Sequence, residues 1–150
     1  MIALFSAVII SCSVNSGKAG SEEMVAIKAC NNMYVTVPAD TCGLKLIARS
    51  KDVGDWERFQ LIYGADKSVN IKANTNLFVC SNFAAGDYLF ADKKNASDWG
   101  KFTIEDLGNN LIAIKASNGK YISADIGMGG VLIAKGEKIG DWEKFTLVKQ

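Results

Sequence analysis

The chain has 150 residues, of which 49% are hydrophobic and 22% charged, with fourteen glycines and one proline. This length suits one globular domain with its own core and leaves too little chain for two domains of usual size. Seventeen basic and sixteen acidic side chains give a formal charge of +1, which disfavours nucleic acid or an anionic membrane surface as the main partner. The chain has no histidine, which excludes Ser-His-Asp and Cys-His catalysis and the commonest zinc and iron sites. We therefore expect neither a metal nor a cofactor.

The first residues have the pattern of an export signal. Ile2 to Ile10 form a nearly continuous apolar run, about half the length of a membrane-spanning helix but typical of the apolar region of a signal peptide. The segment Ile9-Ile10-Ser11-Cys12 resembles a bacterial lipobox, whose cysteine is lipidated and becomes the new N-terminus. We expect a signal peptide at 1–11, lipidation of Cys12 and a flexible tether at 12–23. The alternative is that the apolar run forms a buried first strand.

These features predict an exported protein of the bacterial cell envelope or surface, or a periplasmic or secreted one if the lipid is absent. Contact with the membrane would then come only through the lipid anchor. Three other cysteines remain, Cys30, Cys42 and Cys80, and they lack the C-x-x-C spacing of a metal knuckle. Cys30 and Cys42 flank one expected hairpin and could form a disulfide after export. The other interpretation is that these cysteines are small buried hydrophobic residues.

A repeat of 43 residues dominates the rest of the sequence. Trp56, Trp99 and Trp142 are 43 residues apart, and the same interval separates the aspartate before each and the phenylalanine three positions after each. An Ile-Lys-Ala triplet also recurs upstream in each copy. Such a period shows that the chain is built from copies of one structural unit. The domain is expected at 24–150, with repeats at about 24–66, 67–108 and 109–150.

Each copy contains about four short runs with the character of strands. In the first copy they are Val25–Ala29, Met33–Val37, Leu44–Ala48 and Arg58–Tyr63, separated by polar turns. No segment has a long apolar period of 3.6 residues, so we expect an all-β fold. A propeller blade has a similar period, but a propeller needs at least about four blades to close. Three four-stranded units instead predict a β-trefoil, in which six strands form a short barrel and six cap one end.

The segments around the three tryptophans resemble the Trp-Glu-x-Phe signature of fascin-like β-trefoils. They read GDWERF at 54–59, SDWGKF at 97–102 and GDWEKF at 140–145. That superfamily includes the actin-bundling fascins and carbohydrate-binding modules found beside β-glucan-degrading enzymes. A tryptophan in every copy looks most like the β-glucan-binding modules of carbohydrate-binding module family 92. The resemblance implies multivalent binding of β-glucan or a similar neutral polysaccharide.

Alternation along the last strand of each repeat places the tryptophans on the surface. If Phe59 and Leu61 face the core, Trp56 faces outward beside a carboxylate and offers a flat apolar platform with a polar rim. A pyranose ring stacks on such a platform, and nearby carboxylates and amides orient its hydroxyls. Gly100 replaces the glutamate in the middle copy, so that copy binds sugar only if the tryptophan suffices. The candidate carbohydrate-binding residues are Asp55, Trp56, Glu57, Asp98, Trp99, Asp141, Trp142 and Glu143.

Three other interpretations accompany this one. The tryptophans could cap the barrel, with the glutamate accepting hydrogen bonds from amides of its own repeat. A fascin-like module for protein interaction or adhesion would use an exposed tryptophan as a hot spot. A glycosidase would use Asp55 with Glu57, or Asp141 with Glu143, but carboxylates that recur in two copies fit poorly with one asymmetric active site. We therefore expect a non-catalytic, monomeric protein that binds a neutral polysaccharide.

Overall fold

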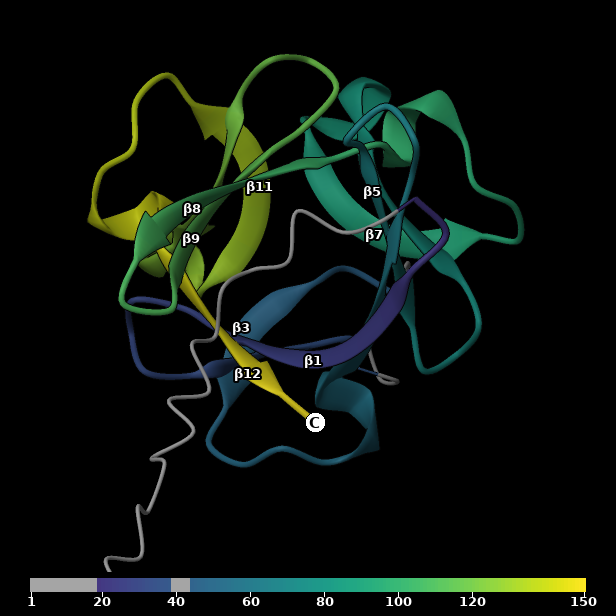
Figure 1. Cartoon of the computed structure of the whole chain (residues 1–150). Coiled ribbons are helices and arrows are strands. Elements are labelled where there is room, and N and C mark those ends of the chain that lie inside the picture. Colours follow the sequence, from purple (N-terminus) through teal and green to yellow (C-terminus); the bar gives the residue numbers. More distant parts are fainter. Residues whose placement is uncertain (1–18, 39–43) are drawn as a thin grey trace, which may run out of the picture.

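The computed structural model describes residues 19–38 and 44–150, so the predicted signal peptide, Cys12 and Cys42 lie outside the described residues. Three lobes surround a common centre, coloured blue, teal, and green to yellow along the chain (Figure 1). No helix in the described part of the chain is long and apolar enough to span a membrane.

The strands of the first repeat are β1 (Glu22–Lys28), β2 (Tyr34–Thr36), β3 (Ile47–Ser50) and β4 (Arg58–Tyr63). Those of the second are β5 (Val69–Ala73), β6 (Phe78–Asn82), β7 (Tyr88–Lys93) and β8 (Thr103–Gly108). Those of the third are β9 (Leu111–Lys115), β10 (Tyr121–Asp125), β11 (Val131–Gly136) and β12 (Phe145–Lys149).

The first and last strands of each repeat form a six-stranded barrel. All of its pairings are antiparallel: β1 pairs with β4 and β12, β4 with β5, and β9 with β8 and β12. The ring closes between the second-repeat strands β5 and β8. There, Val69 and Phe102 exchange two backbone hydrogen bonds of 2.7 and 2.9 Å. The chain therefore returns to its starting strand after three repeats, with β12 beside β1.

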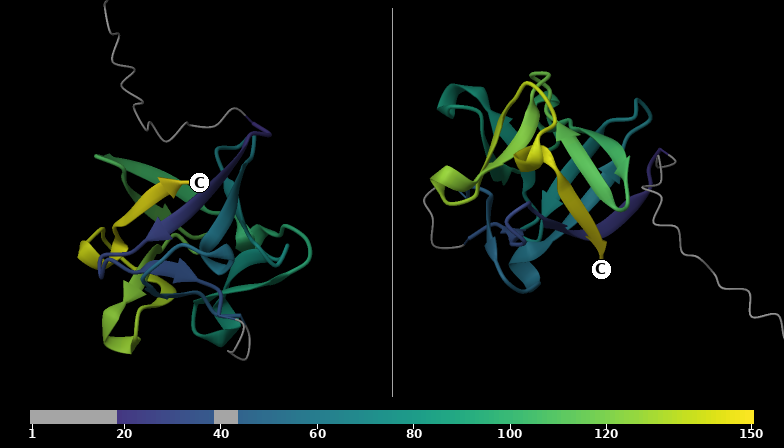
Figure 2. Two further views of the ribbon diagram at one scale, coloured as in Figure 1. Left: turned by 90° about the horizontal axis from the view of Figure 1, so that it is seen from below. Right: turned by 90° about the vertical axis from the view of Figure 1, so that its left-hand side faces the viewer.

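The two middle strands of each repeat form a hairpin, and the three hairpins meet one another. Strand β11 pairs with β3 through Val131 and Ile47, and with β7 through Ile133 and Tyr88. The hairpin turns η2 (Phe83–Ala85) and η4 (Ile126–Met128) lie at the end of the molecule opposite the C-terminus (Figure 2). This arrangement of barrel and hairpin cap is the predicted β-trefoil.

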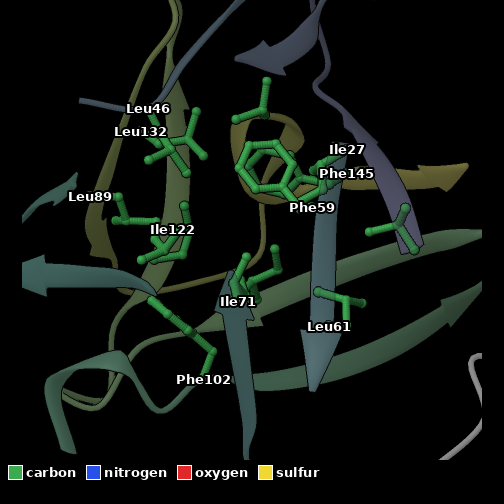
Figure 3. Close-up of a cluster of buried hydrophobic side chains, with 14 of the residues drawn as sticks. Ile27, Leu46, Phe59, Leu61, Ile71, Leu89, Phe102, Ile122, Leu132 and Phe145 are labelled. Atoms are coloured by element: carbon green, nitrogen blue, oxygen red, sulfur yellow. The ribbon is translucent and has the colours of Figure 1, made fainter. Parts of the chain in front are cut away.

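The core repeats as the sequence does. Phe59, Phe102 and Phe145 are at most 1% exposed, and Figure 3 shows them among the aliphatic side chains of all three repeats. The residues two positions later, predicted as their inward partners, pack against the same cluster: Leu61 is buried, and Ile104 and Leu147 are partly buried. The aliphatic members of the cluster include Ile27, Leu46, Ile71, Leu89, Ile122 and Leu132.

Three of the four strands predicted in the first repeat have different bounds in the structure, and the largest differences are at the starts of β1 and β3. Strand β1 begins at Glu22, inside the segment expected to be tether, because Glu22 and Glu23 pair with β4 and Tyr63 Oη donates to the Glu23 carboxylate at 3.1 Å. Strand β3 begins at Ile47 rather than at Leu44. Leu44 has a φ of 50°, a left-handed conformation that an extended strand cannot include. Strand pairing thus extends β1 toward the N-terminus, and the backbone conformation of Leu44 delays the start of β3.

Candidate functional site

Each tryptophan lies in one turn of 3-10 helix, and at most two residues separate this turn from the last strand of its repeat. These turns are η1 (Asp55–Glu57), η3 (Asp98–Gly100) and η5 (Asp141–Glu143). The sequence predicts the tryptophan at the start of the strand itself, and the outward direction that it predicts is the one observed. Trp56, Trp99 and Trp142 are 42%, 50% and 41% exposed. Three large apolar side chains are therefore presented to solvent at equivalent positions.

The aspartate before each tryptophan lies at the rim of its turn. The Asp55, Asp98 and Asp141 side chains are 81%, 90% and 93% exposed. Each pairs with the basic residue three positions later, with nitrogen–oxygen distances of 2.8, 3.4 and 3.8 Å respectively. Exposed ion pairs of this kind contribute about 0 to 1 kcal/mol to stability. The aspartates therefore supply charge and hydrogen-bond acceptors beside the tryptophan while doing little for the fold.

The glutamate after the tryptophan faces inward and closes its own turn. Glu57 is 7% exposed, and its Oε2 accepts the Gly54 amide hydrogen at 2.8 Å. Glu143 accepts the Gly140 amide hydrogen at 2.9 Å and also the hydroxyl hydrogen of Ser123. This is the structural role that the sequence left open for the glutamate. The carboxylate fixes the turn that carries the tryptophan. It is turned toward the protein interior, whereas the aspartate two residues earlier is turned toward solvent.

The middle turn is held in another way. Gly100 is buried, and a Cβ at this position would lie 2.9 Å from the carbonyl oxygen of Val79 in β6. The Asn70 side-chain amide donates to the Gly100 carbonyl oxygen at 2.8 Å. The absence of a side chain lets the turn approach β6 closely. Glycine at this position therefore replaces the glutamate as a means of fixing the turn.

The surroundings of Trp56 form a depression of about 560 Å³ on the first repeat. Strands β2 and β3 supply one side, and η1 supplies Trp56 and Glu57. The other residues that line it are Thr36, Pro38, Arg49, Ser50 and Lys51. An indole, two hydroxyl side chains and two cations therefore converge in one concave surface.

The surroundings of Trp142 in the third repeat carry a buried acid. Lys135 Nζ lies 5.8 Å from the centroid of the Trp142 ring and forms an ion pair with Asp125. Asp125 is buried, and its Oδ1 accepts the Met128 amide hydrogen at 3.1 Å. The hydrogen bond from Lys135 holds the pKa of the Asp125 carboxyl below its usual value. Lys135 is thereby fixed beside the indole.

The surroundings of Trp99 in the second repeat are more apolar. The Phe83 ring packs against the Trp99 ring, with centroids 5.4 Å apart and planes tilted by 58°. Cys80 occupies the position of Ser123, and its Sγ lies 3.3 Å from Asp92 Oδ1. Burial raises the pKa of the Cys80 thiol to about 11, which keeps it protonated at neutral pH. One side of this indole is therefore occupied by the protein itself.

Sequence reasoning did not identify the neighbours of the tryptophans. An alanine also recurs every 43 residues, at 48, 91 and 134. Arg49 and Lys135 directly follow this alanine in the first and third copies, so the repeat alignment contains a signal for them. Phe83 and Asp125 lie in hairpin segments whose sequences differ between copies, and no repeated pattern marks them. Cys30 is an exposed, free thiol. Among residues 19–38 and 44–150, no cluster of three potential metal ligands is found.

Comparison with known proteins rests on structure alone, because no family profile and no curated protein sequence matches the chain. The designed threefold-symmetric protein ThreeFoil has a TM-score of 0.75 at 18% identity, over 85% of this chain and 99% of that one. The fold is a β-trefoil. The BEL β-trefoil has a TM-score of 0.71 at 16% identity, over 91% of this chain and 99% of that one. SeviL, solved with the asialo-GM1 saccharide bound, has a TM-score of 0.69 at 15% identity, over 86% of this chain and 98% of that one.

Proposed function

We propose that this protein is a non-catalytic carbohydrate-binding module that holds β-glucan or a similar neutral polysaccharide on its tryptophan turns. The observation that carries the proposal is the presentation of Trp56 and Trp142 to solvent on turns that a glutamate holds fixed. A turn that is already fixed loses little backbone freedom when a sugar stacks on its indole, so more of the stacking free energy is retained as affinity. The tryptophans are therefore suited to bind a ligand with a flat apolar face.

The chemistry around the two indoles suits a polyhydroxylated ligand. Aromatic burial supplies affinity, while hydroxyl, carboxylate and cationic groups at the rim form hydrogen bonds that orient the sugar. In the first repeat these groups are Ser50, Lys51 and Asp55, and in the third they are Lys135 and Asp141. The Trp-Glu-x-Phe signature supports a fascin-like module of the β-glucan-binding type. The saccharide bound to SeviL supports the use of this fold for sugars, by analogy only.

Two sites on one rigid barrel would act by avidity. A polymer held at one tryptophan raises the effective concentration of its other residues at the second tryptophan. We expect the middle repeat to bind least, because Gly100 replaces the glutamate and Phe83 packs against Trp99. The protein would therefore behave as a bivalent capture module.

A fascin-like interaction with another protein is the second candidate function. A flat, continuous aromatic patch would favour it, since hot-spot residues cluster near the centre of an interface. The three tryptophan turns instead belong to three different lobes, and Trp56 lies in a depression of its own. Tryptophans on separate lobes favour a repeating polymer over one protein partner.

The proposal includes attachment to a bacterial cell envelope through a lipid on Cys12. Nine residues, 13–21, separate this cysteine from the first strand, so an anchored barrel would stand close to the membrane surface. Incorporation of labelled fatty acid by the full chain, and its loss in Cys12→Ser, is the expected result. Equal labelling of both chains would contradict the anchor.

The experiment that tests the sugar function is calorimetric titration of the full chain with β-1,3- and β-1,6-linked gluco-oligosaccharides. We expect saturable binding whose stoichiometry falls by one in Trp56→Ala and by one in Trp142→Ala, and binding that is lost in the double variant. Leu107→Ala is the matched control, because Leu107 is an apolar side chain exposed to 37% and lies outside all three turns. No binding by the unmodified chain, or undiminished binding by the double variant, would contradict the proposal.

A further inference from the structure

The middle repeat has an aromatic side chain beside its tryptophan at a position where the third repeat has an aliphatic one. Phe83, the first residue of η2, packs against Trp99 with ring centroids 5.4 Å apart. The residue 43 positions later is Ile126, the first residue of η4. The two turns occupy the same place in their repeats, and the one in the middle repeat brings a second aromatic ring to the indole.

Both rings are accessible and meet at an angle. Trp99 is 50% exposed, the highest value of the three tryptophans, and Phe83 is partly exposed. Their planes are tilted by 58°, and a tilted contact covers less ring area than a parallel stack. A small apolar group can therefore contact the indole and the phenyl ring at the same time.

The phenyl ring is carried on a fixed turn, as the indole is. The Asn82 side chain caps η2, because its Oδ1 accepts the amide hydrogens of Ala84 and Ala85 at 3.1 and 3.2 Å. On the other side, the close approach of Gly100 to β6 holds the turn of Trp99. Little backbone ordering is then needed when a ligand contacts both rings.

Two polar side chains of the third repeat give way to less polar residues in the middle one. Cys80 stands in place of Ser123, and Gly100 in place of Glu143, each 43 residues earlier. In the third repeat the Ser123 hydroxyl donates to the Glu143 carboxylate. Together with the second aromatic ring, these replacements make the middle repeat the more apolar of the two.

A third replacement reverses a charge. Asp92 stands in place of Lys135, which lies beside the indole of the third repeat. Each oxygen of the Asp92 carboxylate already accepts a hydrogen bond, one from the Cys80 thiol at 3.3 Å and one from Lys93 Nζ at 3.1 Å. The group that presents a cation to the ligand in the third repeat is therefore, in the middle repeat, a carboxylate engaged with its own neighbours.

From these differences we infer that the middle repeat binds a 2-acetamido sugar of the N-acetylglucosamine type, whereas the other two tryptophans take unsubstituted glucose residues. The inference rests on the proposed function and assigns a ligand to the repeat expected to bind β-glucan least. The pyranose stacks on Trp99, and the acetamido methyl packs against Phe83. The amide N–H lies at the rim, where the exposed Asp98 carboxylate, 3.4 Å from Lys101 Nζ, offers acceptor oxygens.

The acetamido group suits this surface better than the hydroxyl that it replaces. A hydroxyl placed against two aromatic rings gives up hydrogen bonds to water without gaining a partner. A methyl in the same place gains free energy from burial of its apolar area. The same substitution gains less at Trp142, where position 126 is aliphatic and Lys135 lies beside the indole.

The test compares two ligands that differ only at carbon 2 of each sugar. The full chain is titrated with a β-1,4-linked gluco-oligosaccharide and with the chito-oligosaccharide of the same length, while NMR follows the three indole N–H signals. We expect the Trp99 signal to give an affinity about fivefold higher for the chito-oligosaccharide, as burial of one methyl group allows. At Trp56 and Trp142 the two affinities should agree within twofold.

Variants at equivalent positions locate the preference. Phe83→Ile installs the residue type of the third repeat and should bring the ratio at Trp99 to within twofold of one. Ile126→Ala is the matched control, because Ile126 is a 38% exposed apolar side chain at the same place in η4, and it should leave the ratio at Trp99 unchanged. Unaltered Trp56 and Trp142 signals show that each variant is folded. In Trp99→Ala, calorimetry should lose the tighter binding of the chito-oligosaccharide.

The outcomes separate this inference from the function on which it rests. Equal affinity of the two ligands at Trp99, with gluco-oligosaccharide still bound at Trp56 and Trp142, would overturn the inference and leave the proposed function in place. A preference for the chito-oligosaccharide that is equal at all three tryptophans, or that survives Phe83→Ile, would overturn the inference as well. No response of any indole to either ligand would overturn both.

Discussion

The first and middle repeats fix the same Asp-Trp turn by two different means. In the first, the Glu57 carboxylate fills the space under the turn and accepts the Gly54 amide hydrogen. In the middle, that space is closed because Gly100 lets the turn approach the Val79 carbonyl oxygen, and Asn70 holds the turn from the side. The residue after the tryptophan therefore serves the fold first. It decides how the indole is held, while the neighbours of the indole decide what it can bind.

The most disruptive change expected within this comparison is Gly100→Ala. The added Cβ would lie 2.9 Å from the carbonyl oxygen of Val79. This oxygen belongs to the backbone of β6, so it cannot move aside as the end of a flexible side chain could. We expect destabilisation of about 2 kcal/mol, as for an overpacked interior site. Denaturant unfolding measures it, with Gly127→Ala as control, because a Cβ there meets only the Asp125 carboxylate at 3.4 Å. Equal stability of the two variants would contradict the close approach in the middle turn.

A smaller loss is expected for Glu57→Ala in the first repeat. The variant removes the acceptor for the Gly54 amide, an interaction of the capping type that contributes about 1 kcal/mol. Asp55→Ala in the same turn is the control, since Asp55 makes only an exposed ion pair with Arg58, of about 0 to 0.5 kcal/mol. Unfolding midpoints that shift equally in both variants would show that Glu57 does not hold the turn.

The fold could be predicted from the sequence because the residues that recur in each repeat are ones that the core requires. Phe59, Phe102 and Phe145 recur at a fixed interval since each fills the same place in the barrel, and the tryptophans recur on the turn before them. The residues around the indoles could not be predicted in the same way, because their contacts depend on the folded structure. Asp125 reaches Lys135 only because β10 and β11 are paired, and the contact of Phe83 with Trp99 joins a hairpin to a turn sixteen positions later.

The smallest expected effect is a dependence of stability on pH that the third repeat has and the first repeat lacks. Pairing with Lys135 lowers the pKa of Asp125 below about 3.9, so its contribution to stability is present above that pH and is lost as the pH falls through the lowered pKa. Carboxyl titration by NMR should show the Asp125 pKa rise in Lys135→Gln and remain unchanged in the exposed-site control Lys138→Gln. An Asp125 pKa that is unmoved by Lys135→Gln would contradict the ion pair. The first repeat offers no equivalent titration, because Pro38 stands in place of Asp125, four residues after the tyrosine that begins β2 or β10.

The most direct test of the central claim is an NMR titration that follows the three indole N–H signals of the full chain with a β-gluco-oligosaccharide. Each signal is assigned by the loss of one peak in the corresponding tryptophan variant. The account predicts saturable shifts for Trp56 and Trp142 and a smaller shift for Trp99, whose ring already packs against Phe83. Binding that leaves all three signals unmoved, or that shifts Trp99 most, would contradict it.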